Sequence, residues 1–222
     1  MEIYLSKAQH YSKVFTQINK RYNSISLLRL LSIFFCLFML FYYIKTNETL
    51  YVLFAVLSFV GFLFLMRIHS KLSFKRELTK AVLKINEDET AYLKREKIPF
   101  ENGIEFNDFH HPYAYDLDIF GEHSLFQNLN RTATFIGKKT LAHKLLHLFS
   151  NETILENQQA IDELKTKIDW RQDFESLAIV STDSKNSYDS LIHWISFKNN
   201  PLSKVLTNRY EIPPEVISLS PS

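Results

Sequence analysis

The pattern of apolar and polar positions divides the chain into an apolar first third and an amphipathic remainder. Two uncharged apolar runs, residues 30–44 and 50–66, are separated by the short polar linker 45–49. A membrane-spanning helix needs about 17–25 predominantly apolar residues, and both runs lie at the short end of that range. Neither run has the polar face that a soluble helix presents to water. We therefore predict an antiparallel transmembrane hairpin over residues 27–68.

The residues that flank the two runs agree with a membrane hairpin. Arg29 is near one end of the first run, where its long side chain can snorkel to the interface. Three tyrosines gather at the linker end, as in an aromatic belt: Tyr42, Tyr43 and Tyr51. Lys45 is the single basic residue between the runs, whereas many basic residues flank them: Lys13, Lys20, Arg21, Arg29, Arg67, Lys71, Lys75, Arg76 and Lys80. The positive-inside rule then predicts an integral membrane protein with both termini in the cytoplasm.

Two alternatives for the apolar runs fit the residues less well. A buried soluble hairpin would need a polar face on each helix. A cleaved signal peptide would begin nearer the N-terminus, end at small residues and have no second span behind it. The single cysteine, Cys36, lies inside the first run, so it acts as a small hydrophobe and no disulfide can form within the chain.

Helical spacing extends the pattern on both sides of the hairpin. Residues 1–26 carry apolar side chains at helical intervals, namely Tyr11, Val14, Phe15, Ile18 and Tyr22. We predict a cytoplasmic amphipathic helix that runs into the first span and either lies on the membrane surface or packs on the soluble part. Residues 69–98 combine a partial apolar stripe with the mixed charges of a solvated face. This pattern predicts one long charged helix. Pro99 is expected to end it, because the residue before a proline is pushed out of the helical region.

The rest of the chain predicts a small cytoplasmic helical domain. A loop over 99–123 precedes a helical region over 124–200, and the tail 201–222 has no helical signal. Candidate helix starts and N-caps are Ser124, Thr134 or Phe135, Ser150 or Asn151, and Asp169, and a last helix is expected over 187–198. Four Gly and six Pro also favour helices over a turn-rich β fold. The predicted fold class is all-α: a transmembrane helical hairpin followed by a long helix and a small cytoplasmic helical domain.

Residues 115–146 resemble the start of the core, or lever, domain of the MutS mismatch-repair ATPase family. The resemblance rests on Ser124, Leu125, Phe126, Leu129, Asn130, Arg131, Thr132, Thr134, Gly137, Lys138, Leu141, Leu145 and Leu146. A second segment continues it at matching spacings, with Ile154, Asn157, Gln158, Ala160, Ile161, Glu163 and Leu164, and Asn157 replaces the usual Arg of the family. The match extends to Trp170 and covers about a quarter of the chain. Taken singly, these residues are also typical of a helical packing motif.

The resemblance implies a helical core that couples ATP hydrolysis to DNA clamping. ATP and Mg²⁺ would bind in a separate domain with a phosphate loop, which residues 1–222 do not contain. The chain would then be an incomplete piece of a longer protein, the membrane anchor and part of the lever, and would transmit a conformational change rather than catalyse. The hairpin and the missing mismatch-reading domain depart from soluble mismatch-repair members, so DNA binding is implied by resemblance alone.

We predict no catalytic, cofactor-binding or metal site in the sequence. The run Gly-Lys-Lys-Thr at 137–140 is not a phosphate loop, because Thr132 stands where that loop needs Gly and Lys139 where it needs Ser or Thr. Residues 120–122, Phe-Gly-Glu, match the Phe-x-Glu pattern with which MutS proteins wedge a base step. In the family that motif belongs to a separate N-terminal domain, so we interpret the match as coincidence.

Histidines and carboxylates do not form a convincing site in the sequence. His143 and His147 share a helix face, but no Glu lies between them and no third ligand is indicated. The other candidates are in loops without fixed geometry: His110, His111, His123, Asp116 and Asp118. A local basic patch could meet nucleic-acid phosphates, and it consists of Arg131, Lys138, Lys139, His143 and Lys144. Acidic residues follow closely and the net charge is only +2, so a solvated helix face is favoured.

Two function hypotheses from different classes remain. In the first, the chain is the membrane anchor and partial lever of a MutS-like ATPase. In the second, it is a stand-alone membrane adaptor whose cytoplasmic helices bind a protein partner. The expected partners are the lipid bilayer, a second copy in a homodimer, or a cytoplasmic protein. A third hypothesis, an enzyme in its own right, has no candidate site among the residues.

Overall fold

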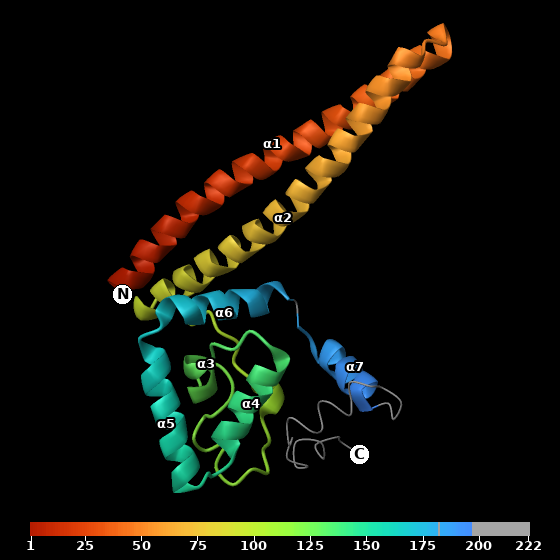
Figure 1. Cartoon of the computed structure of the whole chain (residues 1–222). Coiled ribbons are helices and arrows are strands. Elements are labelled where there is room, and N and C mark those ends of the chain that lie inside the picture. The colour runs from red at the N-terminus through yellow and green to blue at the C-terminus, as the bar shows by residue number, and fades with distance from the viewer. Residues whose placement is uncertain (182, 197–222) are drawn as a thin grey trace.

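The computed structural model describes residues 1–181 and 183–196, and this part of the chain is all-helical, without strands (Figure 1). Two long helices form an extended antiparallel pair, and five short α-helices and a 3₁₀ turn form a smaller unit at one end of that pair. The predicted all-α fold class is confirmed. The predicted tail 201–222 and the end of the predicted last helix lie outside the described residues.

The long pair consists of α1 (Glu2–Thr46) and α2 (Thr49–Leu93), each of 45 residues. At 1.5 Å per residue each helix is roughly 67 Å long. The chain reverses at Asn47, which adopts the left-handed conformation with φ 56°. The N-terminal segment and the first apolar run are one unbroken helix, and so are the second run and the charged segment after it. The N-terminal segment packs along α2, and Lys7 forms an ion pair with Asp169 of the small unit.

Small residues line the seam between the two apolar segments. Ser58 Oγ donates to the carbonyl of Ser32 at 2.8 Å, and Cys36 Sγ lies 3.5 Å from the carbonyl of Ala55. Ala55 is buried, but most of the large apolar side chains in both segments face outward. Both helices are long and apolar enough to cross a membrane.

The charged end of α2 stops at Leu93, before the predicted end of the helix at residue 98. Arg95 adopts the left-handed conformation with φ 58°, and its N–H donates to Tyr92 O at 2.9 Å. The N–H of Glu96 donates to Ala91 O at 3.0 Å. These two bonds form a Schellman motif, which ends the helix before Pro99. The usual signal for this motif is a glycine, and an arginine occupies its position here.

The predicted loop 99–123 is part of the small unit's core. It contains the short 3₁₀ helix η1 (Ile104–Phe106) and contributes buried side chains that pack against Phe126 and Ala142, namely Ala114, Ile119 and Phe120. Gly103 has a φ of 66°, and a Cβ at this position would lie 2.6 Å from the Phe126 ring. Residue 103 must therefore be glycine for the loop to close over Phe126.

Short helices complete the small unit: α3 (Leu125–Leu129), α4 (Phe135–Leu146), α5 (Asn151–Lys165), α6 (Ile168–Val180) and α7 (Lys185–Ser196). The predicted cap Ser124 is confirmed, and of the paired candidates Thr134 caps the helix that begins at Phe135 and Ser150 caps the helix that begins at Asn151. Each of the three side-chain oxygens accepts a backbone N–H of the first turn. The prediction that Asp169 caps α6 is wrong, because the helix begins at Ile168 and Asp169 lies in its first turn. Helix α7 begins two residues before the predicted Ser187, because Ser184 Oγ accepts the N–H of Ser187.

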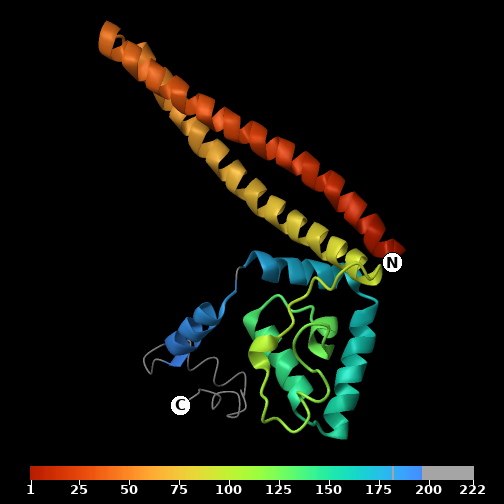
Figure 2. The same ribbon diagram turned by 180° about the vertical axis from the view of Figure 1, so that it is seen from behind.

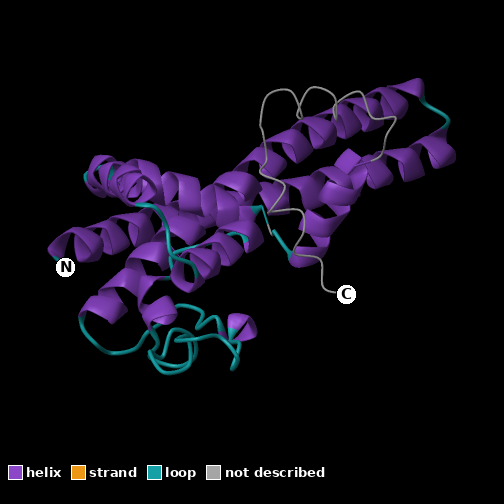
Figure 3. Cartoon of the chain, turned by 90° about the horizontal axis from the view of Figure 1, so that it is seen from below, coloured by secondary structure: helices purple, strands orange, loops and turns teal. Residues whose placement is uncertain are grey.

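Helix α6 joins the two parts of the molecule. It crosses the end of α2, and α5 runs from its start along the side of the small unit (Figure 2). The view from below shows loops, drawn in teal, grouped beside the helices of the small unit (Figure 3). Helix α5 has no buried residue, so its apolar stripe, which includes Ile154, Leu155 and Ile161, remains exposed.

Candidate functional site

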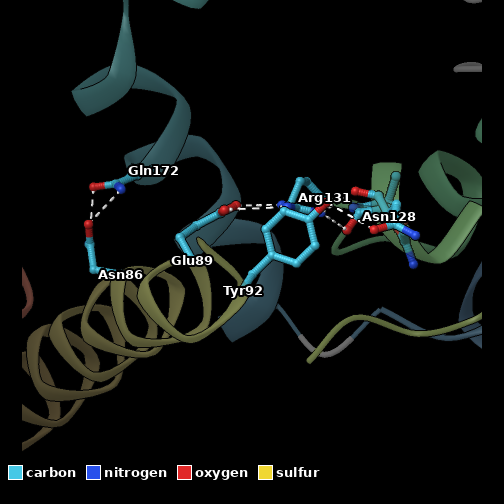
Figure 4. A network of polar contacts seen from close by, with 8 residues as sticks. Asn86, Glu89, Tyr92, Asn128, Arg131 and Gln172 are labelled. Carbon is cyan, nitrogen blue, oxygen red and sulfur yellow. Dashed lines mark hydrogen bonds and ion pairs between the residues drawn. The ribbon is translucent and has the colours of Figure 1, made fainter. Parts of the chain in front are cut away.

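The most elaborate polar arrangement lies where the end of α2 meets α6 and the loop before α4. We call this arrangement the joint, and it comprises Asn86, Glu89, Tyr92, Asn128, Arg131 and Gln172 (Figure 4). Glu175, which lines the same cleft as Glu89 and Arg131, also belongs to it. It brings together residues far apart in the sequence, from α2, from α3 and the loop after it, and from α6. Its contacts determine how the long pair is held against the small unit.

A reciprocal amide pair is the buried centre of the joint. Asn86 is fully buried and Gln172 is almost so. Asn86 Nδ2 donates to Gln172 Oε1 at 3.2 Å, and Gln172 Nε2 donates to Asn86 Oδ1 at 2.9 Å. Asn86 Nδ2 also donates to the carbonyl of Val82 at 2.8 Å. Because an unpaired amide here would lose its hydrogen bonds to water without replacement, the pair fixes the register of α6 on α2.

Arg131 forms the second contact, one turn further along α2. Its guanidinium binds both carboxylate oxygens of Glu89, with Nη2 to Oε2 at 3.3 Å. Nη1 donates to the carbonyls of Asn128 and Asn130 at 3.0 and 3.1 Å. The guanidinium carbon lies 3.4 Å from the centroid of the Phe100 ring. Arg131 thus ties α2 to two loops, and its charge is already matched within the protein.

Tyr92 extends the same face of α2 towards α3. Its hydroxyl donates to Asn128 Oδ1 at 3.0 Å, and the Arg131 guanidinium lies 4.9 Å from its ring centroid. Its ring meets Phe100 edge to face at 5.5 Å between centroids. Tyr92 and Phe100 therefore supply the aromatic surface on which Arg131 rests.

Glu175 of α6 borders a cleft of about 340 Å³ beside the Glu89–Arg131 ion pair. Burial, together with the nearby Glu89 carboxylate, raises the pKa of Glu175 to about 7 against the opposing charges of Arg131 and Arg171. Near neutral pH the carboxyl group is therefore divided between its protonated and ionised forms. The aromatic rings of Trp170 and Phe174 stack at 5.4 Å and also line the cleft.

The basic patch proposed from the sequence does not gather as a free surface. Arg131 is bound to Glu89, Lys138 forms an ion pair with Glu101, and Lys144 Nζ donates to Asn157 Oδ1 at 2.6 Å. Burial also lowers the pKa of the Lys138 ammonium group. Arg131 and Lys138 therefore hold loops and helices together in partly buried ion pairs, rather than lying on the solvated helix face that the sequence favoured.

The structure also places the histidines and aspartates that were considered as candidate ligands. The rings of His143 and His147 stack at 4.0 Å between centroids, and His111 Nε2 hydrogen bonds with Leu146 O at 3.0 Å. Within the described residues, no group of three His, Cys, Asp or Glu side chains could hold a metal ion. Asp116 and Asp118 are exposed in turns, and Asp118 has a φ of 48°.

The two motif-like segments also have structural explanations. Gly137 lies in the first turn of α4, where its N–H donates to Thr134 Oγ1 at 3.1 Å and a Cβ would lie 2.9 Å from that oxygen. Close packing at the helix start explains this glycine. Phe120 is buried in the core, so its ring has no access to a DNA base step.

Sequence reasoning did not identify the joint. Glu89 was assigned to a solvated face and Arg131 to a basic patch, since their contact spans 42 residues of sequence. One local signal existed: Asn86 is a polar residue on the apolar side of α2, among the buried Val82, Ile85 and Thr90. A polar residue at such a position needs a buried partner.

Comparison with known proteins gives no match: no protein-family model, curated protein or solved structure is similar to this chain.

Proposed function

We propose that the chain is a two-span membrane anchor whose long helix α2 transmits movement between the bilayer and a cytoplasmic helical domain. The observation that carries this proposal is the continuity of α2, which runs without a break from an uncharged apolar segment into the joint. Leu53 and Phe64 are about two-thirds exposed on that segment. Such an apolar surface is stable in contact with the hydrocarbon core of a bilayer. A helix can lie there because all its backbone hydrogen bonds form within the helix.

Both termini are proposed to be cytoplasmic, and labelling of single cysteines tests this. In a Cys36→Ala background, Asn47→Cys at the turn should react with a membrane-impermeant maleimide in intact cells. Lys185→Cys at the start of α7 should react only after the membrane is opened. Alkaline carbonate should leave the protein in the membrane fraction. Labelling at 185 in intact cells contradicts the orientation, and release by carbonate contradicts the anchor.

The lever role in a MutS-like ATPase is also a proposal, and the positions of the resembling residues support it. Ser124 and Thr134 cap α3 and α4, Gly137 packs closely at the start of α4, and Arg131 binds α2. The segment of resemblance thus includes one of the two contacts through which α2 is attached. A nucleotide-driven movement of the small unit would be passed to α2 at this contact. ATP, Mg²⁺ and DNA binding would belong to chain outside this sequence.

Sequencing the coding DNA past codon 222, with the native size measured on a blot, separates the two hypotheses. A frame that continues into a glycine-rich loop ending in Gly-Lys-Ser or Gly-Lys-Thr supports the lever of an ATPase. A stop codon and a native band near 26.2 kDa contradict that function and favour the adaptor.

One observation favours the alternative, a stand-alone membrane adaptor. Helices α5 and α6 expose large apolar side chains in the cytoplasmic unit, including Leu155, Ile161, Trp170 and Phe174. Exposed apolar surface of this kind is typical of protein interfaces. Sedimentation of the purified full chain in detergent tests whether a second copy covers it. Dimers that dissociate in Phe174→Glu support a homodimer, and a monomeric wild type contradicts it.

A further inference from the structure

The charges of this nearly neutral chain are strongly segregated. Residues 1–76 contain ten Lys and Arg and two Asp and Glu, whereas residues 77–222 contain sixteen and twenty-two. No Asp or Glu occurs in residues 3–47 or 49–76. Such asymmetry between two parts of one chain indicates a partner of opposite charge for at least one of them.

Six positive charges of the helix pair lie in two facing segments, residues 20–29 of α1 and 67–75 of α2. We call them the basic collar: Lys20, Arg21, Arg29, Arg67, Lys71 and Lys75. Ser26 Oγ lies 3.0 Å from His69 Nε2, and the Tyr22 ring lies 4.4 Å from the His69 ring. Because Arg67 and Lys71 flank His69 by two residues on either side, they lie level with this part of α1. Five of the collar residues are exposed and Arg29 is half-buried.

The collar has no anion of its own. Among the residues that the structure describes, none of its six side chains forms an ion pair, whereas Lys7, Arg131 and Lys138 near the small unit each bind a carboxylate. Arg29 Nε is buried without a hydrogen-bond partner, and its guanidinium carbon lies 5.7 Å from the Phe62 ring centroid. A guanidinium at the edge of an apolar segment that has no carboxylate partner is free to bind an anion from outside the helix pair.

The opposite directions of α1 and α2 bring the side chains of Arg29 and Arg67 towards the same depth. Helical side chains tilt towards the N-terminus of their helix. Helix α1 runs into the apolar segment, so Arg29 tilts away from it, while α2 runs out of the segment, so Arg67 tilts back towards it. The exposed apolar side chains of Leu27, Leu28 and Leu30 border the same level. A ligand that fits both surfaces has an anionic head and acyl chains.

We propose that the basic collar binds the phosphate groups of anionic phospholipids, with Arg29 as the deepest contact. This inference rests on the proposed membrane anchor and adds a ligand class to it. The collar would also orient the hairpin, because the linker end carries only Lys45 as a basic residue. Lipid phosphates would fix the depth at which α2 leaves the bilayer and thereby the position of the joint.

Titration of the full chain in a nonionic detergent tests the proposal, with thermal unfolding followed by circular dichroism. The probes are short-chain phosphatidylglycerol, phosphatidylcholine with the same acyl chains, and inorganic phosphate. Phosphatidylglycerol alone should raise the unfolding temperature. Removal of two exposed charges in Arg67→Gln/Lys71→Gln should weaken the apparent affinity roughly 25-fold, about fivefold for each charge. Arg29→Gln removes one charge and should weaken the apparent affinity for phosphatidylglycerol about fivefold.

A matched control removes two exposed charges elsewhere: Lys165→Gln/Lys167→Gln, at the end of α5 and at the N-cap of α6, should leave the titration unchanged. An equal response to both lipids, or an unchanged affinity in the collar variants, overturns the proposal. A response to inorganic phosphate as strong as that to phosphatidylglycerol overturns the lipid as the ligand. Carbonate extraction of wild-type membranes separates this inference from the anchor itself, because release of the protein contradicts the anchor whatever the lipid preference.

Discussion

In the apolar stretch of the α1–α2 pair, small residues meet across a seam and few side-chain hydrogen bonds cross it. At the charged end of α2, by contrast, a buried amide pair and a bidentate ion pair connect α2 to α6 and the loop before α4. One helix therefore has two kinds of interface. The first depends on shape, since neighbouring side chains in lipid are as apolar as the lipid itself. The second depends on directional polar contacts.

The two interfaces differ in how strictly they fix the positions of the helices. A seam of Ser32, Cys36, Ala55 and Ser58 tolerates small sliding movements, because little directional bonding opposes them. The joint allows one register, because each buried polar atom of Asn86 and Gln172 is satisfied only there. In the proposed function, movement of the small unit would therefore be passed to α2 through this rigid attachment, while the two apolar segments would be able to slide past each other.

The largest expected effect comes from removing the core that supports the joint. Leu145 and Leu146 pack against the buried cluster around Phe126, so Leu145→Asp/Leu146→Asp should unfold the small unit. Limited proteolysis should then cut residues 99–180 rapidly while α1 and α2 remain helical by circular dichroism. The control Leu148→Asp should be tolerated, because Leu148 is 94% exposed. An unchanged melting curve for the double variant would show that these leucines are not core residues.

Loss of the Arg131 ion pair should be the next largest effect. Arg131→Met keeps apolar bulk over Phe100 but leaves Glu89 without its partner, and breaking such a pair should destabilise the small unit by roughly 3 kcal/mol. Chemical denaturation of the full chain in detergent measures this loss. Lys165→Met breaks the exposed pair with Asp162 and should change stability by less than about 0.5 kcal/mol. Equal effects of the two substitutions would contradict the role of the joint.

The amide pair gives a sharper test through a double-mutant cycle. Asn86→Leu leaves the buried Gln172 amide without its partner and should cost about 2 kcal/mol. The double variant Asn86→Leu/Gln172→Leu removes both polar groups and should recover most of that loss. Free energies of unfolding for the four proteins measure the coupling. Additive losses would show that the two amides do not act as a pair.

Local features were predicted well from the sequence, and contacts between distant segments were not. The N-caps Ser124, Thr134 and Ser150 depend on neighbouring residues alone, so their positions follow from spacing. The end of α2 at Leu93 was missed because its left-handed residue is Arg95 rather than glycine. The burial of Phe120 and the Glu89–Arg131 contact depend on how the chain folds back. No local pattern encodes these contacts. The polar residue Asn86 in the apolar stripe indicates that a buried partner exists, without indicating which residue it is.

Because the pKa of Glu175 is raised, the stability of the protein should depend on pH through this carboxyl group of the joint. The folded protein keeps the Glu175 proton that the unfolded chain releases above about pH 4.5. Stability should therefore be highest at low pH and fall as pH rises through 7, and then level off. Glu175→Gln removes this slope, so the variant should exceed the wild type at pH 8 and match it near pH 4.5. Because Glu175 is only partly buried, solvent screening should reduce the gain at pH 8 to about 1 kcal/mol. Denaturation at several pH values measures the difference, and Glu156→Gln on the exposed face of α5 is the control. A constant difference between variant and wild type would contradict the titration of Glu175.

The smallest effect is expected in the apolar seam. Ser58→Ala removes the hydrogen bond to Ser32 O, and interhelical hydrogen bonds in membranes contribute only about 0.6 kcal/mol on average. Reversible unfolding in mixed detergent micelles, followed by circular dichroism, measures this difference. Ser24→Ala is the control, because Ser24 Oγ donates to Lys20 O within α1 and makes no contact across the seam. A loss from Ser58→Ala as large as that from Asn86→Leu would mean that directional bonding also fixes the seam. The bilayer segment would then be as rigid as the joint, and α1 and α2 would move as one body.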